Sequence, residues 1–148
     1  MGGLATKHAS QVLRLANEAA HRLRHQYIGP EHILLGLLKL DNSGAAHVLK
    51  ELGVDRRAVY SEVEKRMEVG DQDALRKNLP LTLGAKKVVE CALGEARGMN
   101  EIPFGSEHLL LGLLREEEGV ATQLLTSCGL RIEQVRNSVL ALRSPVHG

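Results

Sequence analysis

The sequence predicts an all-α protein, and three observations support this fold class. The stretch GPEHILLGLL, which begins at Gly29, returns as GSEHLLLGLL at Gly105. A shift of 76 residues aligns further small and apolar residues at helical spacing without a gap. Apolar residues make up 43% of the chain but aromatic residues only 2%, so the core must be built from aliphatic side chains, and β-branched runs are few. The expected architecture is two pseudo-symmetric four-helix repeats in one compact eight-helix domain.

The repeat also predicts how the chain is divided. We expect a single domain over residues 1–148, with repeat one at about 5–68 and repeat two at about 82–142. The intervening residues 69–81 are polar and contain glycine and proline, which predicts a linker on the surface. The closing RSPVHG is predicted to be a tail or the start of a longer linker.

The helices of the first repeat have recognisable starts and ends. Thr6 can cap a helix that runs to about Arg24. Pro30 suits the first turn of the next helix, because its missing N–H has no helical partner there. Leu35, within the repeated stretch, is predicted to lie in the core. Ser43 can cap the third helix and Gly53 can end it, and Asp55 can cap the fourth helix.

The second repeat is predicted to follow the same scheme. Thr82 can cap the helix LGAKKVVECALGEARG, and Ser106 can cap the helix that carries the second Glu-His pair. Gly129 is predicted to end the third helix, and IEQVRNSVLAL forms the last one. Leu111 is expected in the core for the same reason as its counterpart in the first repeat.

Composition and motifs exclude several classes of function. A formal net charge of +1 recruits neither nucleic acid nor an anionic membrane, and no apolar run reaches the roughly 18 residues typical of a transmembrane helix. The chain contains no GxxxxGK[ST], GxSxG or HExxH motif, so we predict no enzymatic activity and no cofactor. Cys91 and Cys128 form no CxxC pair and are expected to be small core residues of a cytoplasmic protein.

Two pairs of histidines need an interpretation. His21 and His25 lie four residues apart on a predicted helix, the spacing of metal ligands, but arginines flank them and no carboxylate or cysteine partner is obvious. An exposed polar face is therefore the preferred interpretation. His32 and His108 follow the repeated glutamates, and we expect each to hydrogen-bond a neighbouring turn and to help join the repeats rather than to catalyse or ligate.

Glu31 and Glu107 are the strongest candidates for binding. The simple interpretation is that a carboxylate in the first turn complements the helix dipole, which is worth up to about 1 kcal/mol. Neither completes a capping box, because Leu109 stands three residues after Ser106. The alternative is that each carboxylate accepts both N–H arms of a guanidinium, beside a helix N-terminus whose free N–H groups suit a phosphate. The residues alone leave both interpretations open.

Lys86 is a candidate anion ligand in the second repeat. Lys86 and Lys87 lie in the first turns of a predicted helix, where a cation opposes the dipole, and this unfavourable placement suggests an anionic partner. Ser10 and Gln11 occupy the aligned positions of the first repeat, so the basic feature is not duplicated.

The duplicated Glu-His-aliphatic-Gly motif, together with AKKVVE at 85–90, resembles the Clp N-terminal (repeat) domain, most closely that of the ClpC type. The resemblance covers residues 5–142. It implies eight helices in two pseudo-symmetric repeats and a module without chemistry of its own. Such a module docks adaptors and captures protein substrates for an ATPase ring that feeds a peptidase, so Clp ATPase or peptidase subunits are implied as partners. We expect a cytoplasmic protein that is monomeric in isolation.

The same resemblance implies roles for the candidate residues. In ClpC-type modules, residues similar to Glu31 and Glu107 grip the guanidinium of phosphoarginine, a degradation mark, and a lysine similar to Lys86 meets the phosphate. Thr6 and Thr82 match family threonines at the neighbouring helix starts. The sequence departs from the family pattern at His8, Pro30, Gly84 and Ser106. The alternative function is a stand-alone accessory subunit that docks on a Clp peptidase or ATPase complex without binding phosphoarginine.

Overall fold

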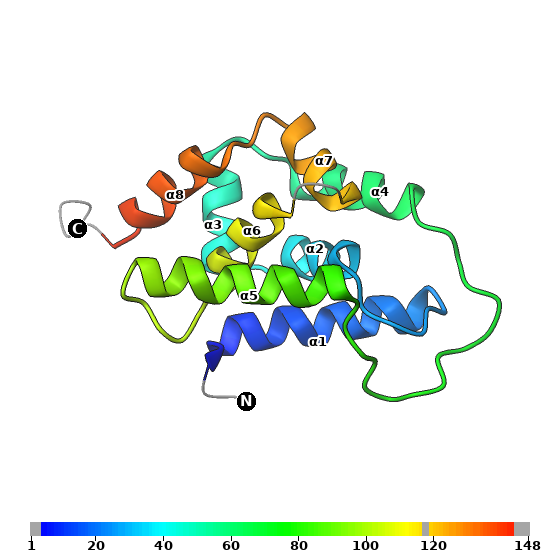
Figure 1. The fold of residues 1–148 in the computed structure, drawn as a ribbon. Helices are drawn as coiled ribbons and strands as arrows, with labels where there is room; N and C mark the ends of the chain where they lie inside the picture. Colours follow the sequence, from blue (N-terminus) through cyan, green and yellow to red (C-terminus); the bar gives the residue numbers. More distant parts are fainter. Residues whose placement is uncertain (1–3, 117–118, 144–148) are drawn as a thin grey trace.

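Eight helices make up the regular structure of residues 4–116 and 119–143, the part of the chain that a computed structural model describes (Figure 1). The first repeat contains α1 (Lys7–Arg22), α2 (Pro30–Lys39), α3 (Gly44–Glu51) and α4 (Arg56–Lys65). The second contains α5 (Leu83–Gly98), α6 (Ser106–Arg115), α7 (Val120–Ser127) and α8 (Ile132–Ala141). The prediction of an all-α fold with two four-helix repeats is confirmed.

Most of the predicted helix starts are confirmed. The Oγ1 atom of Thr6 accepts a hydrogen bond from the N–H of Ala9 at 3.1 Å, and Thr82 accepts one from Ala85 at the same distance. These bonds satisfy N–H groups that have no partner within the helix. The other confirmed side-chain caps are Ser43 and Asp55.

Residues with positive φ end or follow several helices. Gly53 and Gly129, the predicted stops of α3 and α7, have φ of 78° and 89°, a region that glycine adopts without strain. Helix α1 ends at Arg22, close to the predicted end at about Arg24: Leu23 caps the helix, and Arg24 turns the chain with φ of 60°.

Ser106 corrects one predicted cap. It is the first residue of α6, and Gly105 occupies the N-cap position instead. The Ser106 Oγ accepts a hydrogen bond from the N–H of Ala45 at 3.0 Å, in the first turn of α3. This bond crosses from one repeat to the other, so spacing within one repeat could not indicate it.

The helices that carry the Glu-His pairs form the centre of the domain. Helices α2 and α6 pack on each other and on helices of both repeats, and the long α1 and α5 run along one side of them (Figure 1). Residues are buried continuously over 32–38 and 106–113. Leu35 and Leu111 are 1% and 0% exposed, so their predicted place in the core is confirmed.

The glycine inside each LLGLL stretch allows two helices to cross closely. A Cβ atom at Gly36 would lie 2.5 Å from the backbone oxygen of Val12 in α1. Gly112 faces the backbone oxygen of Val88 in α5 in the same way. Because a backbone carbonyl stands opposite, only a residue without a side chain fits at this crossing. Close packing of the helices is thus the reason that this glycine recurs. The sequence analysis did not identify this reason.

Two short backbone bridges join the repeats crosswise. Ala5 pairs with Phe104 and Ile28 pairs with Leu81, each as an isolated parallel bridge. A shift of 76 residues converts one pair into the other. As a result, the start of α1 lies beside the start of α6, and the start of α5 lies beside the start of α2. Residues from both repeats therefore meet at each of these places.

The segment between α4 and α5 lies on the surface and is fastened to α1. The side chain of Asn17 donates to the carbonyl oxygen of Lys77 and accepts from the N–H of Leu79, both at 2.9 Å. His21 Nε2 contacts the same oxygen of Lys77 at 2.9 Å. These side-chain bonds hold the segment in place although it contains no helix.

The cysteines differ in part from their prediction. Both are free thiols, and Cys91 is half-buried on α5. Cys128 is exposed, because it caps the C-terminal end of α7 in the turn toward Gly129. The expected core position is therefore wrong for Cys128.

The predicted tail continues beyond Arg143, and residues 144–148 lie outside the described part of the chain. Within that part, no helix is both long enough and apolar enough to cross a membrane.

Candidate functional site

Two pockets related by the repeat lie at the starts of α2 and α6. The Glu31 pocket has a volume of about 190 Å³ and the Glu107 pocket one of about 290 Å³. The Glu31 pocket is lined by residues that include His25, Tyr27, Glu31, His32, Arg66 and Met67. The Glu107 pocket is lined by residues that include Thr6, Glu101, Pro103, Glu107, His108 and Arg143. Both predicted glutamates thus line pockets, in equivalent positions.

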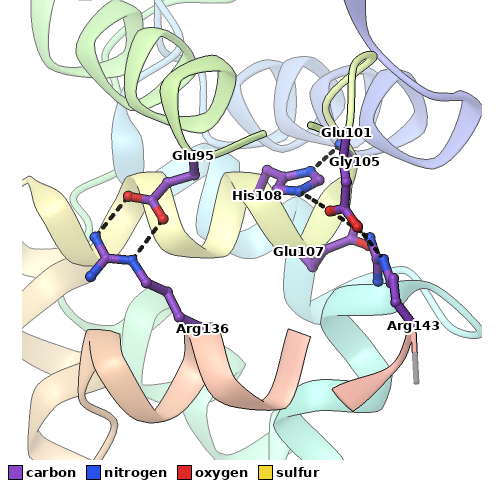
Figure 2. Close-up of polar contacts among 7 residues, drawn as sticks. All are labelled: Glu95, Glu101, Gly105, Glu107, His108, Arg136 and Arg143. Carbon is purple, nitrogen blue, oxygen red and sulfur yellow. Dashed lines mark hydrogen bonds and ion pairs between the residues drawn. The ribbon is translucent and has the colours of Figure 1, made fainter. Parts of the chain in front are cut away.

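The carboxylate of Glu107 is buried between two helix starts. Glu107 lies in the first turn of α6 and is 8% exposed. A Cβ atom at Gly44 would come within 2.9 Å of this carboxyl group, so the carboxylate also faces the first turn of α3. The positive ends of two helix dipoles favour its negative charge. The carboxylate accepts a hydrogen bond from Nη2 of Arg143 at 2.6 Å (Figure 2).

The Arg143 guanidinium bridges two carboxylates of the Glu107 pocket. Besides its bond to Glu107, it donates to Glu101 from Nε at 2.7 Å and from Nη2 at 3.2 Å (Figure 2). Burial opposes the charge of the guanidinium, but these hydrogen bonds outweigh burial and raise the pKa of Arg143 above its usual value. Glu107 therefore already holds a guanidinium, and the sequence analysis identified neither Arg143 nor Glu101 as its partners.

His108 holds the second carboxylate of this pocket in place. Its Nδ1 accepts a hydrogen bond from the N–H of Gly105 at 2.7 Å, which places the ring proton on Nε2. Nε2 lies 3.0 Å from Oε1 of Glu101 and donates to it. His108 thus takes the place of the Glu or Gln of a capping box. The predicted bond to a neighbouring turn is present, but these two bonds do not join the repeats, because both partners belong to the second one.

The first repeat has a histidine where the second has Glu101. His32 Nδ1 accepts from the N–H of Gly29 at 2.8 Å, so its Nε2–H donates to Nδ1 of His25, also at 2.8 Å. The Nε2–H of His25 in turn donates to the carbonyl oxygen of Glu68 at 2.6 Å. This chain of hydrogen bonds connects the start of α2 to the segment after α4.

Burial keeps His32 uncharged at neutral pH. The ring is 1% exposed. Burial, followed by the neighbouring charges of His25 and Arg22, lowers the pKa of His32 to about 4. Protonation of Nδ1 would also place a second donor opposite the N–H of Gly29, and the hydrogen bond that Nδ1 now accepts would be lost.

Glu31 is half-buried and forms no ion pair with another described residue. Met67 occupies the position that aligns with Arg143, so the first repeat lacks the arginine that covers its counterpart. Arg66 and Tyr27 line the Glu31 pocket. The lining therefore includes two acidic residues, Glu31 and Glu68, together with a cation and a tyrosine. Sequence reasoning missed Arg66, because it follows α4 and is brought to α2 only by the fold.

Of the three predicted phosphate ligands, only Thr6 is among the residues that line these two pockets. Thr6 lines the Glu107 pocket, although it belongs to the first repeat. Thr82 lies at the start of α5 beside α2, since its N–H donates to the carbonyl oxygen of Ile28 at 2.9 Å. Lys86 is exposed on α5 and is not among the residues that line either pocket. The structure thus brings the two threonines, but not the lysine, to the helix starts that carry the glutamates.

The spacing of His21 and His25 serves hydrogen bonding. His21 contacts the carbonyl oxygen of Lys77, and His25 lies between His32 and the carbonyl oxygen of Glu68. Over residues 4–116 and 119–143, no three His, Cys, Asp or Glu side chains are grouped so that they could hold a metal ion.

A further buried ion pair lies outside both pockets. Glu95, which is 8% exposed, accepts from Nε and Nη2 of Arg136, both at 2.8 Å (Figure 2). Arg115 donates to the same carboxylate at 3.3 Å. The bond from Arg136 is the main reason that the pKa of Glu95 lies below its usual value. Ala19 stands at the aligned position of the first repeat, so this pair stabilises the second repeat alone.

The fold and the duplicated pockets define a helical double-repeat domain with an acidic residue at the start of each central helix. The chain belongs to the Clp repeat (R) N-terminal domain family, whose profile matches residues 4–102 and 92–145. It is 44% identical over 142 residues to the chaperone protein ClpB of Oceanobacillus iheyensis. It is 42% identical over 142 residues to the negative regulator of genetic competence ClpC/MecB of Bacillus subtilis. Each match covers 96% of this chain but only 17% of the relative, so the chain spans about a sixth of those proteins.

Solved structures share the fold. The N-terminal domain of the caseinolytic protease associated chaperone ClpD from Arabidopsis thaliana has a TM-score of 0.74 at 20% identity, covering 95% of this chain and 96% of that one. The Hsp104 N-terminal domain from Candida albicans has a TM-score of 0.73 at 16% identity, covering 94% and 91%. At such identities the likeness shows the fold alone. The family resemblance drawn from the duplicated motif is confirmed by the family profile.

Proposed function

We propose that the chain is a non-catalytic docking module for protein substrates or adaptors of a Clp machine, and that it recognises phosphoarginine on them. The observation that carries this proposal is the pair of related pockets, each with a glutamate in the first turn of a central helix. Membership of the Clp repeat family supports the docking role, because relatives such as ClpC/MecB carry the matching segment as a small part of a longer protein.

The chemistry of the glutamates favours a guanidinium as the bound group. Glu107 accepts a hydrogen bond from Arg143 at 2.6 Å, and a ligand guanidinium would need a similar bond at the aligned Glu31. Hydrogen bonds between guanidinium and carboxylate are roughly twice as strong as neutral ones and restrict the plane of the bound group. The half-buried position of Glu31 strengthens such a bond, since little water competes for it.

A phosphate attached to the guanidinium needs cations and donors nearby. Arg66 lines the Glu31 pocket and is the cation best placed to meet it. Thr82 caps α5 beside the start of α2, and we assign its hydroxyl to the same phosphate. Lys86 lies one turn further along α5, outside the pocket lining, and we propose that its exposed side chain reaches the phosphate from solvent. Thr6, which aligns with Thr82, lines the Glu107 pocket.

A calorimetric titration with phosphoarginine tests the proposal, with free arginine and phosphoserine as controls. We expect saturable binding of phosphoarginine that is lost in Glu31→Gln. The matched control is Glu62→Gln, which removes an exposed carboxylate of α4 and should leave binding unchanged. If the folded, unaltered protein does not bind phosphoarginine, the proposed recognition is wrong.

The ion pair between Glu107 and Arg143 favours a second function, that of an accessory subunit. One of the two pockets already holds a guanidinium of the chain itself, so docking on a Clp peptidase or ATPase complex would use other surfaces. In that case, Clp subunits should be retained by the immobilised chain equally well with and without Glu31→Gln. Retention that depends on Glu31 would exclude this alternative.

A further inference from the structure

We infer that Arg143 is a built-in occupant of the Glu107 pocket, so that only the Glu31 pocket is open to a guanidinium from another molecule. The inference deepens the proposed function and rests on it for the identity of the natural ligand. It assigns the two pockets different states, although the repeat relates their glutamates. An external guanidinium reaches Glu107 only after Arg143 has moved away.

The geometry at Glu107 is that of a filled guanidinium site. Arg143 makes three hydrogen bonds of 2.6 to 3.2 Å to the carboxylates of Glu107 and Glu101. Glu101 is itself held by the Nε2–H of His108, so this acceptor is positioned independently of the guanidinium. Figure 2 shows the arginine entering from the end of α8 and pointing between the two carboxylates. The Arg143 guanidinium lies between the two carboxylates, so a second planar cation cannot pair with Glu107 and Glu101 together while these bonds persist.

Arg143 can leave this site without unfolding the core. Its side chain is 37% exposed, whereas those of Glu107 and Glu101 are 11% and 21% exposed. It follows the last residue of α8, Ala141, by two positions, outside the helix. The guanidinium therefore covers the pocket from its solvent side, and rotation of one side chain would open the pocket.

The Glu31 pocket lacks counterparts of both Arg143 and Glu101. Glu68 also lines this pocket, where its carbonyl oxygen accepts a hydrogen bond from His25. Met67 stands at the position that aligns with Arg143, and His25 at the position that aligns with Glu101. Glu31 therefore has no ion-pair partner at these positions of the described chain. Arg66 adds a positive charge at the rim. The carboxylate of Glu31, in a pocket that Arg66 also lines, suits a guanidinium that carries an anionic group. The two carboxylates of the Glu107 pocket instead suit an unmodified guanidinium and repel an attached phosphate.

Competition with Arg143 sets the expected size of the effect. A group tethered to the same chain acts at an effective concentration in the millimolar range or above. The apparent affinity of a ligand is the intrinsic affinity multiplied by the fraction of molecules whose pocket is open. We therefore expect a small guanidinium to bind the Glu107 pocket at least about tenfold more weakly in the unaltered protein than in Arg143→Gln.

The test is a titration of the 15N-labelled chain with N-methylguanidinium at constant ionic strength, followed through the backbone amides of Gly29 and Gly105. In the unaltered protein, the Gly29 signal should shift saturably while Gly105 stays unchanged over the same range. In Arg143→Gln both signals should respond. Arg97→Gln, which removes an exposed arginine of α5, is the matched control and should behave like the unaltered protein.

Two results would overturn the inference: an equal response of both amides in the unaltered protein, or no response of Gly105 in Arg143→Gln. A second measurement covers the case in which Arg143→Gln disturbs α8. In the unaltered protein, the Nε–H proton of Arg143 should exchange with water at least tenfold more slowly than that of Arg97, and equal exchange would also overturn the inference. Phosphoarginine is titrated in parallel. If it fails to bind while N-methylguanidinium behaves as expected, the proposed recognition of phosphoarginine is wrong and the inference stands.

Discussion

Replacement of Gly36 by alanine should force apart the two helices that cross most closely in the first repeat. The added Cβ would lie 2.5 Å from the backbone oxygen of Val12 and 3.3 Å from the backbone nitrogen of Ala16. Carbon–oxygen contacts between helices are ordinarily about 3.3–3.6 Å, so α1 and α2 must separate by roughly 1 Å. Neither opposing atom belongs to a side chain that could rotate away.

The expected loss of stability follows from this separation. A gap of about 0.5–1 Å removes a quarter to a half of the dispersion attraction across it, and overpacked cores generally lose about 1–3 kcal/mol. We take about 3 kcal/mol here, because backbone atoms oppose the new methyl group. Alanine in place of a helix-interior glycine returns about 1 kcal/mol. The net decrease in unfolding free energy is therefore about 2 kcal/mol, or about 4–8 °C in Tm.

Urea unfolding followed by circular dichroism at 222 nm measures this difference. The matched control is Gly94→Ala in α5, where the new Cβ would meet only a flexible side-chain atom of Arg115, at 3.7 Å. This variant should be neutral or more stable by up to about 1 kcal/mol. If Gly36→Ala is as stable as Gly94→Ala, the explanation of the repeated glycine by close helix crossing is wrong.

Three further predictions concern the core, pH and capping. Leu111→Asp should fail to fold, because an unpaired charge would enter a fully buried position; a soluble variant with a cooperative transition would show that this face is not core. Because the pKa of His32 is about 4 in the folded protein, below its usual 6.5, the unfolded state binds more protons between these values. Stability should therefore be fully present above pH 6.5 and fall by about 2 kcal/mol between pH 7 and pH 5, and equal urea midpoints at these two pH values would contradict this. Ser106→Ala should lower the unfolding free energy by about 1–2 kcal/mol in the same assay, because the buried N–H of Ala45 loses its acceptor. A decrease below about 0.5 kcal/mol, the size of a typical surface effect, would mean that this bond between the repeats is not stabilising.

Local signals in the sequence predicted the helices well because each depends on near neighbours. Thr6 and Thr82 cap helices through the N–H three residues later, and Gly53 ends one through its own backbone conformation. Where the partner is distant, the same reasoning gave the wrong answer. Serine commonly caps helices, but the hydroxyl of Ser106 accepts a hydrogen bond from the N–H of Ala45, which the fold brings close from the other repeat.

The candidate site shows the same division between local and distant information. Glu31 and Glu107 were identified from the sequence, because the duplication places an acid at the same point of two helices and capping does not require it there. Their surroundings could not be predicted from the duplication, since it implies two equal sites. Glu107 is covered by Arg143 from the end of α8, and the aligned residue of the first repeat is a methionine.

The sequence by itself determined the helical class, the two repeats, the family and the positions of the two glutamates, because helical period, capping and duplication are all recorded in the order of residues along the chain. Only the tertiary structure decided which residues surround each glutamate. The bridge of Ala5 with Phe104 brings Thr6 to the Glu107 pocket, and Val120 at the start of α7 lines the Glu31 pocket, so each pocket contains a residue from the other half of the chain. The physical reason is that hydrogen bonds and ion pairs act over a few ångströms in space, whatever the number of residues between the partners.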